Sequence, residues 1–119
     1  LPRDLTDDAR RLDVSLAWLV AAAARRSLEL IVAIGPKRIA AHDLGLARGF
    51  AEQLGLPLPS SPIVRLEVES AAGLADSLGE AGISCSVRAG SVRLSFHLYN
   101  DEADVERVVD VLRRAGLRA

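Results

Sequence analysis

Two runs of alternating residues meet at the dipeptide Ala89-Gly90, and they constrain the fold more than any other feature of the chain. A two-residue loop fixes the register of a β-hairpin, so we predict strands over Ile83 to Arg88 and Ser91 to Tyr99. In that register, three apolar pairs share one face: Val87 with Val92, Cys85 with Leu94, and Ile83 with Phe96.

The opposite face of the hairpin is polar and carries Arg88 and Arg93. An arginine fork binds carboxylates and phosphates strongly and with defined geometry. A polar face is also what the solvated side of an antiparallel sheet carries, so both interpretations stay open on the residues alone. The polar set is Ser84, Ser86, Arg88, Ser91, Arg93, Ser95, His97 and Tyr99.

Alternation also predicts a strand from Ile63, and helical spacing predicts short helices on both sides of the hairpin. We expect Ser70 to cap the first of these helices and Asn100 to cap the last. The first has Leu74 and Leu78 on its inner face and closes at Gly82. The last buries Val105, Val108, Val109 and Leu112 and ends at Gly116.

Two longer helices are predicted in the first half, over Leu16 to Ile34 and Pro36 to Leu54, with a break at Gly35-Pro36. The first is apolar almost all round, so we expect absent structure to cover it, and self-association where it is exposed. The second is expected to bury the stripe Ala40, Leu44, Ala47, Ala51 and Leu54, with Gly55 after its end.

The predicted fold class is therefore α+β, a two-layer small domain with a short, largely antiparallel sheet covered by helices, in the order α-α-β-α-β-β-α. We place the main division in the proline-rich stretch 56–62. Residues 1–55 would then be a connecting segment with two helices, and residues 56–119 a C-terminal α/β unit.

The composition excludes several classes of function. Fifteen basic and sixteen acidic residues leave a net charge of -1, and aromatic residues make up only 3%, so we expect no nucleic-acid partner. The longest apolar run, Leu16 to Ala24, is too short for a bilayer, and no signal peptide is visible, so we expect a cytoplasmic protein without a membrane partner. The chain begins with Leu1 and contains no methionine, which indicates a processed or excised piece.

No metal or nucleophile site emerges from the motifs. The two histidines, His42 and His97, lie on different elements without an obvious third ligand, so we expect no metal site and a solvated His42. Cys85 alternates with serines on the apolar face, where a small core residue is far more common than a reactive thiol. We therefore assign no catalytic residue to this chain.

The segment SVRLSFHLYNDEADVERVVDVL, residues 91–112, resembles the C-terminal end of class V aminotransferases, which are fold-type I enzymes that use pyridoxal phosphate (PLP). Their usual ending reads like VRxSPHFYNTEEEVDRLLEAL. The matching positions are Val92, Arg93, Ser95, His97, Tyr99 and Asn100, whereas Phe96 replaces a proline and Leu98 an aromatic residue. Residues 27–47 and 9–18 are similar to earlier segments of the same C-terminal portion.

The resemblance implies that Arg93 binds the α-carboxylate of an amino acid substrate, while His97, Tyr99 and Asn100 are structural. It also implies a homodimer and a large PLP-binding domain that this chain lacks. The only lysine, Lys37, stands where the family has an ordinary surface residue. We therefore expect PLP in the parent enzyme, none bound to this chain, and no turnover by the chain alone.

At two places the sequence differs from the family pattern, and these differences bear on the expected reaction and on the expected cofactor contact. Only four residues separate Arg88 from Arg93, which leaves no room for the cysteine loop of the desulfurases, so an aminotransferase, an epimerase or another amino acid transformation fits better. Ser15 and Leu16 replace a Gly-Thr pair whose threonine helps to hold the cofactor phosphate. The alternatives are a stand-alone small-ligand binding or regulatory module, and a noncatalytic subunit that completes a partner's site.

Overall fold

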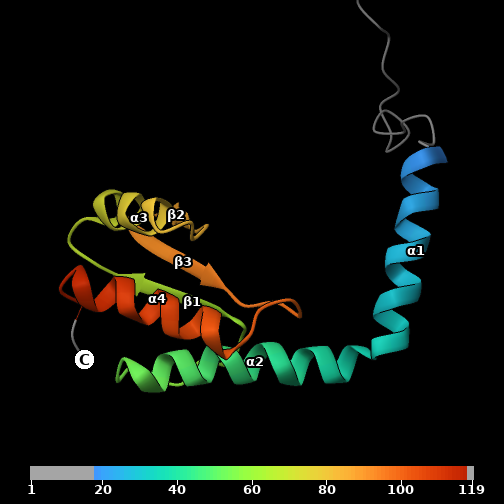
Figure 1. Cartoon of the computed structure of the whole chain (residues 1–119), viewed down its shortest axis with the longest axis horizontal. Coiled ribbons are helices and arrows are strands. Elements are labelled where there is room, and N and C mark those ends of the chain that lie inside the picture. The colour runs from blue at the N-terminus through green and yellow to red at the C-terminus, as the bar shows by residue number, and fades with distance from the viewer. Residues whose placement is uncertain (1–17, 118–119) are drawn as a thin grey trace, which may run out of the picture. The chain divides into compact units, whose positions relative to one another are not determined.

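The computed structural model describes residues 18–117, and within them it confirms the α+β class and the expected order of elements. The chain divides into two compact units, Leu1–Ile34 and Gly35–Ala119. The elements in Figure 1 are α1 (Trp18–Ile34), α2 (Pro36–Gln53), β1 (Ile63–Glu67), α3 (Ala71–Glu80), β2 (Ser86–Arg88), β3 (Ser91–Ser95) and α4 (Glu102–Arg114).

The first unit contributes α1, a helix of 17 residues of which none is buried. Its exposed apolar side chains include Trp18, Leu19 and Val32. Alanine and leucine favour the helix, and Gly35 with a φ of 96° followed by Pro36 separates it from α2. Among the described helices, none is both long enough and apolar enough to cross a membrane. The expected start of this helix at Leu16 lies outside the described residues.

In the second unit the three strands form one antiparallel sheet in the order β1-β3-β2, so β3 is central. The turn residues Ala89 and Gly90 both have positive φ values, 46° and 72°. This is the pattern of a two-residue hairpin turn. The predicted register is confirmed where β2 exists, because Arg88 lies opposite Ser91 and Val87 opposite Val92.

The outer part of the predicted hairpin is wrong, because β2 covers only Ser86–Arg88 and β3 ends at Ser95. Neither Cys85 with Leu94 nor Ile83 with Phe96 forms a ladder pair. Ile83 instead belongs to the end of α3, because its amide donates to the carbonyl of Leu78 at 2.9 Å.

The cap of α4 also differs from the prediction. Asp101, not Asn100, is the N-cap residue, and its Oδ1 accepts from the amide of Asp104 at 3.0 Å. Asn100 is engaged elsewhere, because its Oδ1 accepts from the amide of His97 at 3.0 Å. The cap of α3 is as predicted, with Ser70 Oγ accepting from the amide of Gly73 at 3.2 Å.

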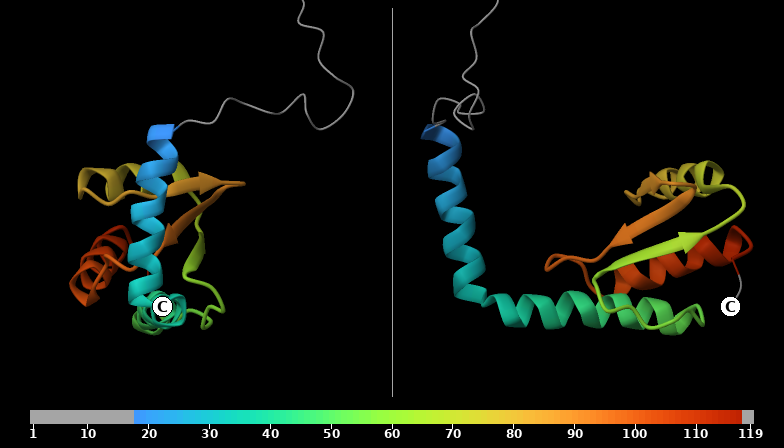
Figure 2. Two further views of the ribbon diagram at one scale, coloured as in Figure 1. Left: turned by 90° about the vertical axis from the view of Figure 1, so that its right-hand side faces the viewer. Right: turned by 180° about the vertical axis from the view of Figure 1, so that it is seen from behind.

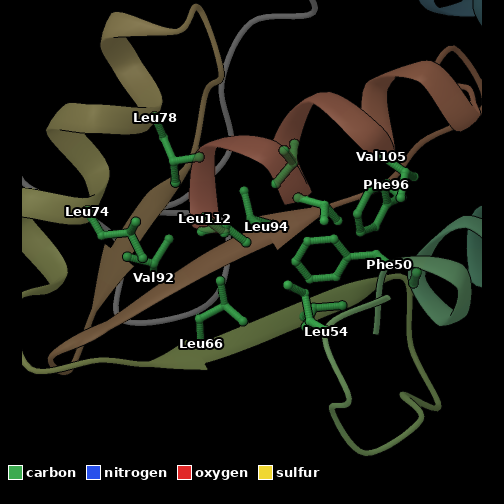
Figure 3. Close-up of a cluster of buried hydrophobic side chains, with 14 of the residues drawn as sticks. Phe50, Leu54, Leu66, Leu74, Leu78, Val92, Leu94, Phe96, Val105 and Leu112 are labelled. Atoms are coloured by element: carbon green, nitrogen blue, oxygen red, sulfur yellow. The ribbon is translucent and has the colours of Figure 1, made fainter. Parts of the chain in front are cut away.

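The hydrophobic core lies between the sheet and the three helices α2, α3 and α4 (Figure 3). At its centre Phe50 of α2 meets Phe96, with ring centroids 5.5 Å apart. Complete burial of such a side chain contributes about 1.5–3 kcal/mol. The core members are Leu46, Ala47, Phe50, Leu54, Val64, Leu66, Ala71, Leu74, Leu78, Val92, Leu94, Phe96, Val105, Val108, Val109 and Leu112.

The buried stripe of α2 is rotated from the predicted one. Ala40 is exposed and Leu44 only partly buried, whereas Leu46 and Phe50 face the core. Large side chains decide the orientation, because they bury far more apolar area than alanines do. Since α2 shares the core, it belongs to the same compact unit as the sheet, and the proline-rich stretch 56–62 connects α2 to β1 within that unit.

All three helices pack on one face of the sheet, which leaves the other face open. Val64, Leu66, Val92 and Leu94 point into the core, so the alternate residues of each strand point away from it. In the right-hand view of Figure 2, β1 and β3 lie in front of α4, and the open face is turned toward the reader.

Candidate functional site

The open face of the sheet carries three arginines, one on each strand. Arg65 of β1 lies directly opposite Arg93 of β3, and Arg88 of β2 lies opposite Ser91 of β3. Glu67 is the one acidic residue among the outward-facing ladder positions of the described strands. The ladder positions of the face that the helices leave uncovered therefore carry more basic than acidic side chains, and we call it the arginine face.

Arg93 occupies the central position of the arginine face. It lies in the central strand, between Arg65 on one side and Ser86 on the other, and it is partly buried. Within residues 18–117 its guanidinium group takes part in no salt bridge and no hydrogen bond. A guanidinium group held on a strand without a partner can bind a carboxylate through two parallel hydrogen bonds.

Arg65, in contrast, is held in place by its neighbours. Its Nε donates to the hydroxyl of Ser91 at 2.9 Å, and its Nη2 lies 3.1 Å from Glu67 Oε1. Ser91 is only 2% exposed, so this hydrogen bond satisfies a buried hydroxyl group. No motif in the sequence assigns a role to Arg65. Its only signal is that it alternates with Val64 and Leu66 on the polar side of its strand.

The turn that follows β3 holds the remaining residues of the family-like motif. The rings of His97 and Tyr99 stack with centroids 5.4 Å apart and an interplanar angle of 14°. His42 Nε2 donates to the carbonyl of Asn100 at 3.0 Å, which ties α2 to this turn. These contacts are consistent with structural roles for His97, Tyr99 and Asn100.

The pKa of Asp104, at the start of α4, is displaced from its ordinary value. Asn100 Nδ2 donates to Asp104 Oδ2 at 3.0 Å and lowers the pKa of that carboxyl group below 3.8. Desolvation of the carboxyl group opposes this shift, whereas a backbone hydrogen bond at Asp101 and the charge of Arg107 also lower the pKa. Asp104 therefore holds the turn as a carboxylate, and it lies next to a pocket of about 270 Å³ that Ser84, Ser95 and Tyr99 also line.

Residues that could hold a metal ion or PLP do not come together here. Among the described residues there is no group of three or more histidine, cysteine, aspartate or glutamate side chains with metal-binding geometry. Cys85 is partly buried and packs against the core, as expected. Lys37 is exposed in the first turn of α2, a position that does not suit a buried Schiff base, so the residues present do not fit PLP. Ser15 and Leu16 lie outside the described residues.

One buried polar atom has no partner. Asp43 lies on the core side of α2 and is 6% exposed, and its Oδ1 accepts no hydrogen bond from the residues that the structure describes. The sequence showed this carboxylate beside His42 but gave no sign of its burial, because the predicted stripe of α2 did not include position 43.

Comparison with known proteins adds no further assignment: no family model, curated protein or solved structure matches this chain.

Proposed function

We propose that this chain is the small C-terminal domain of a PLP-dependent enzyme of the class V aminotransferase type, and that Arg93 binds the α-carboxylate of its amino acid substrate. The observation that carries the proposal is the position of Arg93 on the open face of the sheet, without a partner among the described residues. The similarity of residues 91–112 to the family's ending supplies the identity of the ligand group.

The geometry supports a carboxylate contact better than a merely solvated face. Opposite charges that face each other on neighbouring strands stabilise a sheet, whereas like charges directly opposite destabilise it. Arg93 has another arginine, Arg65, as its neighbour on β1. An anion between them would offset this repulsion, and a substrate carboxylate provides one.

The cofactor belongs to a part of the enzyme that this chain does not contain. Lys37 is exposed and far better explained as a surface residue, so the lysine that holds PLP lies in the large domain. PLP would supply electron withdrawal there, and this unit would supply the arginine that orients the substrate. A homodimer and a cytoplasmic location complete the proposal, and both follow from the family resemblance and the sequence.

The identity of the enzyme is tested on the native polypeptide. An antibody against this chain would isolate the protein from source cells, and borohydride would fix any PLP to its lysine before peptide mapping. We expect a polypeptide several times larger than 12.7 kDa with a pyridoxyl-lysine outside residues 1–119. A 12.7 kDa polypeptide without such a lysine in it or in a co-purified partner would contradict the proposal. A stand-alone binding module would then be the better interpretation.

The role of Arg93 is tested by kinetics of that enzyme. Arg93→Gln removes a charged bidentate contact worth about 2–3 kcal/mol, so KM for the amino acid should rise roughly 30- to 150-fold. Arg107→Gln is the matched control, because Arg107 is an exposed arginine on α4 away from the arginine face. An unchanged KM in Arg93→Gln, with both variants folded, would exclude the assignment.

A further inference from the structure

The register of the sheet says more about the ligand than the presence of Arg93 alone. We infer that Arg65 and Arg93 together bind a dicarboxylate, so that the substrate is an amino acid with a second carboxylate on its side chain. This inference rests on the proposed function, because Arg93 takes the α-carboxylate. Its new element is Arg65, which takes the other one.

The two arginines form the closest kind of cross-strand pair. The amide of Phe96 donates to the carbonyl of Pro62, so Val64 with Leu94 and Leu66 with Val92 are the hydrogen-bonded pairs of this ladder. The pair between them, Arg65 with Arg93, is a non-hydrogen-bonded pair. Such pairs have Cα atoms about 4.5 Å apart and the nearest side chains of an antiparallel sheet. The side chains of Arg65 and Arg93 therefore extend from adjacent positions on the open face.

Arg65 can still bind a ligand, although its side chain already contacts Ser91 and Glu67. The bond from its Nε to the buried hydroxyl of Ser91 fixes the stem and leaves the Nη groups outermost. Its pairing with Glu67 is a weak competitor, because the two side chains are 58% and 78% exposed and exposed ion pairs contribute about 0–1 kcal/mol. A ligand carboxylate can displace Glu67 without disturbing the bond to Ser91.

The arginine face has a local positive charge that favours binding of a small anion. Its ladder positions hold Arg65, Arg88 and Arg93 against Glu67, a net charge of +2 (three positive minus one negative), on a chain whose net charge is -1. A polyanion such as nucleic acid is bound through many phosphate contacts along an extended basic surface, which three arginines and one glutamate do not provide. A small dianion that reaches two adjacent guanidinium groups gains from both of them.

The experiment uses the full 119-residue chain, labelled with ¹⁵N, and follows the arginine Nε resonances by NMR. Glutarate is the dicarboxylate probe and butyrate its monocarboxylate counterpart, and ionic strength is held constant with chloride. We expect glutarate to bind about tenfold more tightly than butyrate, since one additional charged contact is worth that much or more. Both resonances, from Arg65 and Arg93, should shift with glutarate, whereas Arg93 should dominate the response to butyrate.

The variants separate the two arginines. In Arg65→Gln the preference for glutarate should disappear while the Kd for butyrate changes by less than about twofold. In Arg93→Gln both probes should bind more weakly. Ser91→Ala removes the bond to Arg65 Nε and should lower the preference for glutarate without abolishing it. Arg107→Gln is the unaffected control, and Arg88→Gln removes the same charge from the same face outside the pair.

The outcomes distinguish the two levels of the argument. If butyrate binds through Arg93 but glutarate binds no more tightly, the inference about Arg65 is overturned and the proposed function stands. If neither probe moves the Arg93 resonance, both are overturned. If Arg88→Gln reduces the glutarate preference as much as Arg65→Gln does, only net charge attracts the ligand and the pairwise site is wrong. The amide spectrum of each variant establishes that it is folded.

Discussion

Replacing Asp43 by alanine should stabilise the unit Gly35–Ala119. Asp43 is 6% exposed, on the core side of α2, with an Oδ1 that has no partner among the described residues. A buried polar group without a partner costs about 1–3 kcal/mol, and alanine is the better helix former by up to roughly 0.7 kcal/mol. The small void that alanine leaves offsets part of this gain, so we expect about 1–3 kcal/mol in total.

Thermal unfolding followed by far-UV circular dichroism measures this change, because the sole tryptophan, Trp18, lies in the other unit. For a domain of this size, each kcal/mol shifts Tm by about 4–8 °C. Asp110→Ala is the matched control: Asp110 is exposed in the interior of α4, so the same substitution there changes helix propensity and little else. If Asp43→Ala gains no more than Asp110→Ala, the carboxylate of Asp43 has a partner in solution and the reasoning fails.

Two further predictions concern the turns on either side of β3. Ala89 has a φ of 46°. Asparagine tolerates this left-handed conformation better than alanine because its side chain can form local hydrogen bonds, so Ala89→Asn should raise the free energy of unfolding by about 0.5–1 kcal/mol; a loss in urea unfolding would argue against the hairpin turn. The pKa of Asp104 lies below 3.8 because of Asn100, so its ionised form stabilises the fold above pH 3.8, and this contribution is lost as the pH falls through the lowered pKa. NMR titration of the Asp104 carboxyl carbon should show its pKa moving upward in Asn100→Ala, and an unmoved pKa would assign the shift to another neighbour.

Most of the fold could be predicted from sequence features that act over a few residues. The Ala89-Gly90 turn determines its own register, and Ser70 determines the start of α3, because each acts on residues within a few positions along the chain. The prediction failed where two local solutions compete. Asn100 and Asp101 are equally good cap residues in the sequence, and in the structure the side chain of Asn100 is engaged by His97 and Asp104, whereas Asp101 caps the helix.

Of the two arginines of the candidate site, only Arg93 could be predicted from the sequence. Arg93 stands in a motif and on a hairpin whose register can be read from the sequence. Arg65 becomes its neighbour only through the pairing of β1 with β3, two strands whose relative register no turn determines. The burial of Asp43 likewise depends on how Leu46 and Phe50 orient α2 against the sheet.

Arg93→Gln should affect stability and carboxylate binding differently, so this one variant tests both roles of Arg93. Arg93 satisfies no buried group within the described residues and faces a like charge, Arg65, on the adjacent strand. Removing it should therefore leave the unit as stable as before, or more stable by about 0.2–1 kcal/mol, the range for a cross-strand pair. The same variant, Arg93→Gln, should lose carboxylate binding. An equal or higher free energy of unfolding in urea, together with lost carboxylate binding, would show that Arg93 serves ligand binding at the expense of the stability of the sheet. A loss of more than 1 kcal/mol would instead give Arg93 a structural role, because a residue whose removal destabilises the sheet must already have a favourable contact in it.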